Sequence, residues 1–104
     1  MMGFQLRQSD GSYYTSATWI DVNGETQSYP DGAFMAEPLK ETRVAGRDIP
    51  IRWRVRLPDR DLDAEVLALT SKAWMDVSIP YWEGPVGISG SHFGRGYLEM
   101  TGYQ

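Results

Sequence analysis

The strongest constraint on the fold is a strict alternation of residue types in the middle of the chain. Between positions 51 and 57 every second residue is apolar, and each residue between them is an arginine. Successive side chains of a β-strand point to opposite faces, so this pattern places the apolar set in a core and the arginines outside. We therefore expect a strand here with one buried and one exposed face.

The following segment indicates how this strand pairs. After a loop at 58–61, the pairing of Leu57 with Leu62 determines which residues face each other. The register then places Arg56 opposite Asp63 and Arg54 opposite Glu65, and on the other face Val55 opposite Ala64 and Trp53 opposite Val66. A slip by one residue would carry every side chain to the wrong face. We therefore interpret residues 61–72 as a strand, although they are also the best helix candidate in the chain.

Short apolar or alternating runs make up the rest of the chain, and their spacing is typical of β-sandwiches and barrels. The other expected strands are 4–8, 13–21, 25–29, 39–44, 73–79, 86–91 and 97–103, with a loop at 80–85 and a glycine-rich turn at 92–96. A two-residue type I′ turn at Asp10-Gly11 would set Leu6 against Thr15 and Phe4 against Ala17. The final strand is expected to be central, because it has large alternating side chains and no proline.

Composition narrows the function classes. The chain has 104 residues, a net charge of −4, no cysteine and one histidine, His92. We therefore expect one domain without disulfides, zinc ribbons or a multi-histidine metal site, and no cofactor is implied. The negative charge argues against a nucleic-acid partner. Neither a signal peptide nor a run long enough to span a membrane is visible, so a cytoplasmic location is expected for the sequence as given.

Carboxylates and aromatic residues alternate near the end of the chain. Glu83 and Glu99 would form a general acid–base pair if they met in an apolar pocket, where burial raises the pKa of a carboxyl group. We favour the alternative that they are structural residues. The arginines at 52, 54 and 56 are interpreted as a solvated face neutralised by Asp63 and Glu65 rather than as an anion site. His92 is interpreted as a surface loop residue.

The four tryptophans supply much of the apolar bulk of the chain. Trp19 and Trp74 are expected in the core, whereas Trp53 fits the core and the wall of a ligand pocket equally well. The sequence contains no nucleophile elbow, P-loop, dinucleotide fingerprint or metal-binding spacing. No reaction class is therefore indicated by a short motif.

The closing segment reads Tyr81-Trp82-Glu83-Gly84-Pro85-Val86 and then Gly96-Tyr97-Leu98-Glu99-Met100-Thr101-Gly102-Tyr103. It resembles the C-terminal signature of a lipocalin-like family. That family includes the carotenoid 1,2-hydratases (hydroxyneurosporene synthase), the predicted secreted hydrolases called AttH and the fungal kievitone hydratases. Two earlier segments, 5–12 and 19–24, also resemble strands and turns of its C-terminal region. The resemblance covers nearly the whole chain and is weakest at 33–47.

The resemblance implies a single lipocalin-like β domain over residues 1–104, which corresponds to the second lobe of a two-lobe family. The fold is then an all-β, antiparallel, lipocalin-like (calycin-type) barrel or half-barrel of about eight strands. The first lobe and the cleft between the lobes have no counterpart, so the hydratase or hydrolase activity does not carry over. Family members are often exported.

Three functions remain open. We favour a non-catalytic module that binds a small apolar molecule through Trp53, Trp82, Tyr97, Glu99 and Tyr103. The second is a hydratase or lyase that acts on an isoprenoid or polyketide double bond, with Glu99 and Tyr97 as the candidate catalytic residues. The third is an assembly module that pairs with another copy or a separate first lobe. A homodimer that forms through the hairpin 4–21 is expected.

The side chain of Glu99 distinguishes two arrangements of the last strand. Alternation places Leu98 and Met100 on one face and Tyr97, Glu99 and Tyr103 on the other. We favour the arrangement in which the aromatic face lines a cavity, so that Glu99 is buried and needs a hydrogen-bond donor. In the other arrangement Leu98 and Met100 face the core, and Glu99 is a structural residue outside it.

Overall fold

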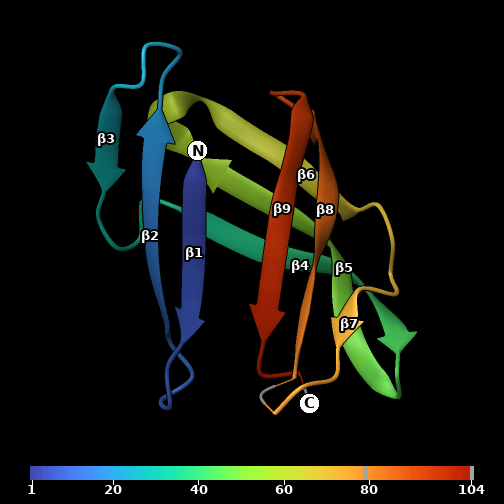
Figure 1. The fold of residues 1–104 in the computed structure, drawn as a ribbon. Coiled ribbons are helices and arrows are strands. Elements are labelled where there is room, and N and C mark those ends of the chain that lie inside the picture. The colour runs from blue at the N-terminus through green and yellow to red at the C-terminus, as the bar shows by residue number, and fades with distance from the viewer. Residues whose placement is uncertain (79, 104) are drawn as a thin grey trace.

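The computed structural model describes residues 1–78 and 80–103, and this part of the chain is all β apart from one short 3₁₀ helix (Figure 1). The strands are β1 (Met2–Arg7), β2 (Tyr13–Ile20), β3 (Thr26–Tyr29), β4 (Met35–Val44), β5 (Arg47–Leu57), β6 (Leu62–Ala68), β7 (Trp74–Met75), β8 (Tyr81–Gly90) and β9 (Gly94–Thr101). The helix η1 (Pro58–Arg60) joins β5 to β6. The strand content confirms the all-β class predicted from the alternating pattern.

Across the described residues, the strands form two antiparallel sheets that do not close into a barrel. One sheet has the order β1-β2-β3, and the other has the order β4-β5-β6-β8-β7 with β9 paired to β8. Within this part of the chain, β1 and β9 each pair with a single neighbouring strand, and their arrows point the same way in Figure 1. The fold is therefore an antiparallel, lipocalin-like half-barrel, which is one of the two forms, barrel or half-barrel, that the family resemblance implies.

The pairing of β5 with β6 confirms each predicted pair. These pairs are Trp53/Val66, Arg54/Glu65, Val55/Ala64, Arg56/Asp63 and Leu57/Leu62. The ion pairs run diagonally, since Arg54 binds Asp63 with an N–O distance of 2.7 Å and Arg52 binds Glu65. Each of these arginines thus binds the acid two positions before its direct partner on β6, since Arg54 faces Glu65 and Arg52 faces Leu67. The charged face stays outside.

The first hairpin corrects the expected register by one residue. Leu6 lies opposite Tyr14 rather than Thr15, and Phe4 lies opposite Ser16 rather than Ala17. Because side chains alternate, this slip turns Phe4 and Leu6 outward, where they are 50% and 55% exposed. The inner face of this hairpin carries Thr15, which is 5% exposed.

The turn of this hairpin explains the slip. Gly11 N donates to the Gln8 carbonyl at 3.0 Å, and Gln8 N donates to the Ser12 carbonyl at 2.8 Å, so the loop holds three residues rather than two. Gly11 has a φ of 86°, whereas Asp10 is not in the left-handed region, as a type I′ turn would require. The Asp10 carboxylate instead accepts a hydrogen bond from Ser12 N at 2.9 Å, which stabilises the turn.

Two strands are longer than expected because packing outweighs turn signals. β4 covers 35–44 rather than 39–44, and a bulge after Pro38 lets the strand continue past the proline. β8 begins at Tyr81, inside the expected loop 80–85, because the fully buried Trp82 holds that segment in the sheet. The carbonyl of Pro85 still accepts a hydrogen bond from Leu69 N at 3.0 Å.

The last third differs in two further ways. β7 comprises Trp74–Met75 only, compared with the expected strand 73–79, whose residue 79 lies outside the described residues. β9 begins at Gly94, inside the expected glycine-rich turn. Among the described strands β9 pairs with β8 alone, so it is an edge strand and not the expected central one. Alternation of large side chains therefore indicates a strand but not its place in the sheet.

Two apolar clusters form the core. The first joins the two sheets and contains Ala17, Tyr29, Phe34, Leu57, Leu62 and Ala64. The second lies within the larger sheet and contains Val44, Ile49, Trp82 and Met100. Phe34 packs so closely on β1 that a Cβ atom at Gly3 would lie 2.9 Å from its ring. A glycine at position 3 is thus what allows Phe34 to link the sheets.

Candidate functional site

The predicted binding residues lie in different surroundings in the structure. Trp82 is fully buried, and its indole Nε1 donates to the Ser71 carbonyl at 3.2 Å. Trp53 is partly buried and packs against the second cluster. The ring of Tyr103 is half-buried, lies 5.9 Å from the Arg7 guanidinium, and has its pKa raised mainly by burial. Trp82 and Trp53 therefore belong to the core.

Tyr97, Glu83 and Glu99 come together on the outer face of β8 and β9. Glu83 lies directly opposite Glu99, and the Tyr97 hydroxyl donates to a Glu83 carboxylate oxygen at 2.8 Å. Tyr97 is 66% exposed, and the exposed side chain of Glu99 has no hydrogen bond to a described residue. The favoured expectation that Glu99 is buried is thus wrong.

The reason lies in the opposite face of β9. Met100 is 6% exposed and belongs to the second cluster, and Leu98 packs against that cluster. The aliphatic face is therefore the core face, and strand alternation sends the Tyr97 and Glu99 side chains outward. Glu99 is exposed and Glu83 is partly buried, so the two carboxylates meet on the outer face of the sheet rather than in the apolar pocket that an acid–base pair would require.

The remaining aromatic expectations are met in part. Trp19 is partly buried against the first cluster, with the Arg60 guanidinium 5.2 Å from its ring and the His92 ring 5.9 Å away. His92 lies in the turn between β8 and β9, as expected of a loop residue, and its Nδ1 is 2.9 Å from the Ser91 hydroxyl. Trp74 is partly buried against the second cluster.

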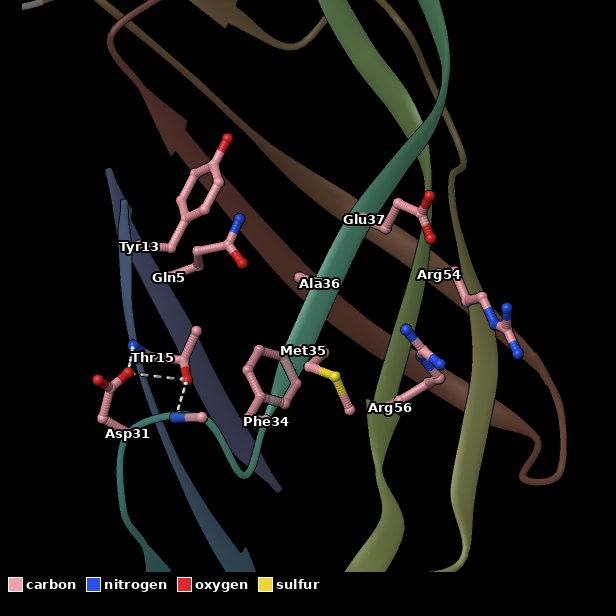
Figure 2. A pocket seen from close by; sticks show the side chains of 11 residues that line it. Gln5, Tyr13, Thr15, Asp31, Phe34, Met35, Ala36, Glu37, Arg54 and Arg56 are labelled. Carbon is pink, nitrogen blue, oxygen red and sulfur yellow. Dashed lines mark hydrogen bonds between the residues drawn. The ribbon is translucent and has the colours of Figure 1, made fainter. Parts of the chain in front are cut away.

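An open groove of about 430 Å³ lies between the inner face of β1–β2 and the strands β4 and β5 (Figure 2). Its lining residues are Gln5, Tyr13, Thr15, Asp31, Gly32, Phe34, Met35, Ala36, Glu37, Arg54 and Arg56. In Figure 2 the apolar side chains of Phe34, Met35 and Ala36 lie between a polar wall on β1–β2 and the arginines of β5. We call this the sheet groove.

The polar wall of the sheet groove is held rigidly by Asp31. Its carboxylate accepts a hydrogen bond from Thr15 N at 2.8 Å, and the Thr15 hydroxyl accepts one from Gly32 N at 2.9 Å. These bonds join the turn after β3 to β2. The Asp31 side chain is therefore already engaged by the backbone that shapes the groove.

Arg54 and Arg56 line the β5 side of the sheet groove, and they differ in their ion pairs. Both oxygens of Asp63 bind Arg54, at 2.9 and 2.7 Å, and these bonds lower the pKa of Asp63. The side chain of Arg56, a partly buried residue, has no ion pair or hydrogen bond with the described residues. It can therefore meet a polar group on a molecule in the sheet groove.

The sheet groove was not predicted from the sequence, because its wall comes from separate segments. β1, β2, the turn after β3, β4 and β5 each contribute one to three lining residues. The expected register of the first hairpin also differs by one residue, which would have turned Gln5 away from the groove. Within the described residues there is no group of three or more metal-binding side chains, and no helix is long and apolar enough to cross a membrane.

Comparisons with known proteins agree on one family. The family model described as AttH-like matches residues 1–103. A crystal structure of a candidate AttH protein from Nitrosomonas europaea is similar to this chain, with a TM-score of 0.85 and 27% sequence identity. The match covers 98% of this chain and 34% of that protein, so this chain spans about a third of its neighbour's length. A search of the curated proteins finds no match.

The contact between Tyr97 and Glu83 gives a prediction about pH. The hydrogen bond to Glu83 raises the pKa of Tyr97, because ionisation of the phenol would break the bond and place two negative charges together. The stabilisation is present below the usual tyrosine pKa and is lost as the pH rises through the raised value. Titration followed by NMR of the tyrosine ring carbons should show Tyr97 titrating late.

The change Glu83→Gln should move the Tyr97 midpoint down toward the usual value. Glu99→Gln is the matched control, and because Glu99 raises the pKa of Tyr97 less than Glu83 does, it should move the midpoint less. A Tyr97 midpoint that is the same in Glu83→Gln and in the unaltered protein would contradict the contact.

Proposed function

The chain belongs to the AttH-like family, and on that premise we propose that residues 1–104 act as one lipocalin-like lobe that binds a small, mainly apolar molecule in the sheet groove. The observation that carries the proposal is the groove itself, about 430 Å³ in volume, between two sheets that do not close within the described residues. Ligand sites are typically clefts of about 300–1,000 Å³ with apolar walls and a few polar groups.

The lining chemistry supports a ligand with an apolar body and one polar end. Phe34, Met35 and Ala36 offer apolar contact, whereas Arg56 offers a cation that no described side chain neutralises directly. Tyr13 adds a hydroxyl at the opposite wall. The proposed site thus replaces Trp53, Trp82, Tyr97, Glu99 and Tyr103, which do not line this groove.

A hydratase or lyase reaction at Glu99 and Tyr97 has less support. Such a reaction needs an acid that protonates an alkene and a dry pocket that shelters the resulting cation. Glu99 and Tyr97 are both exposed on the outer face of β9. We therefore propose binding rather than catalysis for this lobe.

Occupancy of the sheet groove can be tested with N-phenyl-1-naphthylamine, a neutral apolar probe whose fluorescence rises in apolar surroundings. Gln5 points into the groove from β1, so Gln5→Trp should fill it and weaken probe binding by about tenfold, in line with the cost of overpacking. Gln8→Trp makes the same change at an exposed position outside the groove and should leave binding unchanged. Equal probe affinities of the two folded variants would refute this site.

A second candidate function, assembly with another copy of the chain, is favoured by the outer face of β1–β2. The side chains on this face are uncharged, and Met2, Phe4 and Leu6 on it are 69%, 50% and 55% exposed. Two copies with a net charge of −4 each repel one another as whole molecules. An uncharged face adds no local repulsion, so it is the face at which two copies approach most easily. Such a face on an edge hairpin suits a twofold contact.

Sedimentation velocity at high micromolar concentration tests this assembly. The unaltered protein should sediment as a dimer, and Phe4→Ser should sediment as a monomer because it removes the central ring of the face. Phe93→Ser is the matched control, since Phe93 is 83% exposed and lies in the turn before β9. A monomeric unaltered protein, or loss of the dimer in Phe93→Ser alone, would contradict the assembly.

A further inference from the structure

A second groove, of about 420 Å³, is cationic although the chain as a whole is acidic. It lies between the turn that joins β4 to β5 and the segment between β6 and β7. Its lining residues are Arg43, Val44, Ala45, Ser71, Lys72 and Trp74. Among the described residues that line it none is acidic, so its own side chains carry a charge of about +2 at neutral pH.

A third cation is fixed beside this groove. The Arg47 guanidinium lies 4.4 Å from the centre of the Trp74 ring, and its Nη1 donates to the Ala45 carbonyl at 2.6 Å. An arginine held by a ring face and a backbone carbonyl keeps its charge in place. Part of the positive potential beside the groove therefore comes from an arginine that the turn holds in place.

Two buried donors at the same place lack acceptors. Arg47 Nε and Trp74 Nε1 are covered by other atoms, and neither has a hydrogen-bond partner in the described part of the chain. Buried donors are normally paired, so two unpaired donors on side chains that stack on each other are an uncommon feature. At this end of the half-barrel, these two buried donors therefore outnumber the acceptor atoms within their reach.

The acids close to the groove do not neutralise it. Asp48 binds Arg43 through one oxygen at 3.0 Å, and both side chains are largely exposed, at 61% and 68%. A contact so open to water is weak, and the other donors of Arg43 stay available. Lys72 forms no ion pair with a described residue.

We propose that this cationic groove binds the phosphate group of a small phosphorylated molecule. A phosphate group carries about −1.5 to −2 charges at neutral pH, which matches Arg43 and Lys72 together, and its oxygens supply several strong acceptors. The Ser71 hydroxyl gives a further donor, and Val44 and Trp74 offer apolar contact to the organic part. The site is separate from the sheet groove and does not depend on the function proposed for it.

Inorganic phosphate is the probe for the test, at constant ionic strength made up with sodium chloride. The nitrogen–proton NMR signals of the four indoles report the titration, and Trp74→Phe identifies the Trp74 signal by its loss. The Trp74 signal should shift and saturate with phosphate, whereas the Trp19 signal, which belongs to the other cluster, should stay in place.

The chain offers a matched pair of lysines for the control, Lys40 and Lys72. Lys72→Gln removes a charge-assisted contact and should weaken phosphate binding by about tenfold. Lys40→Gln removes the same charge from an exposed position on β4 outside the groove, where screening limits the change to less than about twofold. Equal weakening in both variants would overturn the proposal, since it would reflect net charge alone.

Two further outcomes decide the chemistry of the ligand. Chloride alone could shift the Trp74 signal as far as phosphate does. That result would refute specific binding of phosphate in this groove. If acetate saturates the signal at the same concentration as phosphate, the proposal that the groove prefers the doubly charged phosphate group is refuted. Saturation by phosphate, with weaker binding of acetate, supports it.

Discussion

The pairing of β5 with β6 is the interaction on which the rest of this half-barrel depends. Its alternating side chains fix one register, because any slip by one residue would bury the arginines and expose Trp53 and Val55. The inner face of this pair supplies Leu57 and Leu62 to the cluster that joins the two sheets. The outer face keeps the arginines in water, where diagonal ion pairs hold Arg52 and Arg54. Both faces of the molecule are thus organised from one hairpin.

The two grooves follow from how this sheet ends. The described strands do not close into a barrel, so the smaller sheet stands over β4 and β5 and leaves the sheet groove along them. At the far end of the same pair of strands, the turn at 45–46 carries Arg47 against Trp74 and forms the cationic groove. Two chemically different openings on one small lobe are the basis for proposing that it binds ligands, and neither includes the exposed Glu99.

Sequence reasoning succeeded where one face of a strand differs sharply from the other. The β5–β6 register could be predicted because charge and apolar patterns demand the same pairing. The first hairpin could not, because a turn containing Asp10-Gly11 suits loops of two or three residues and the strands around it carry no charge pattern that selects one. The core-facing side of β9 was predicted wrongly, because Leu98 and Met100 offer a smaller apolar surface than the tyrosines on the other face. In the structure, Met100 is buried in the second cluster and Leu98 packs against it, so their face is the core face. The grooves depend on contacts between distant segments, which local patterns do not encode.

The most direct test of the account is solution NMR of the backbone around β5 and β6. Nuclear Overhauser contacts across the two strands report which residues face each other. We expect contacts that match the pairs Arg54/Glu65 and Arg56/Asp63 at their backbone positions, with Leu57 and Leu62 closing the hairpin. Contacts displaced by one residue, with Arg54 facing Ala64, would contradict the register and with it the arrangement of both sheets.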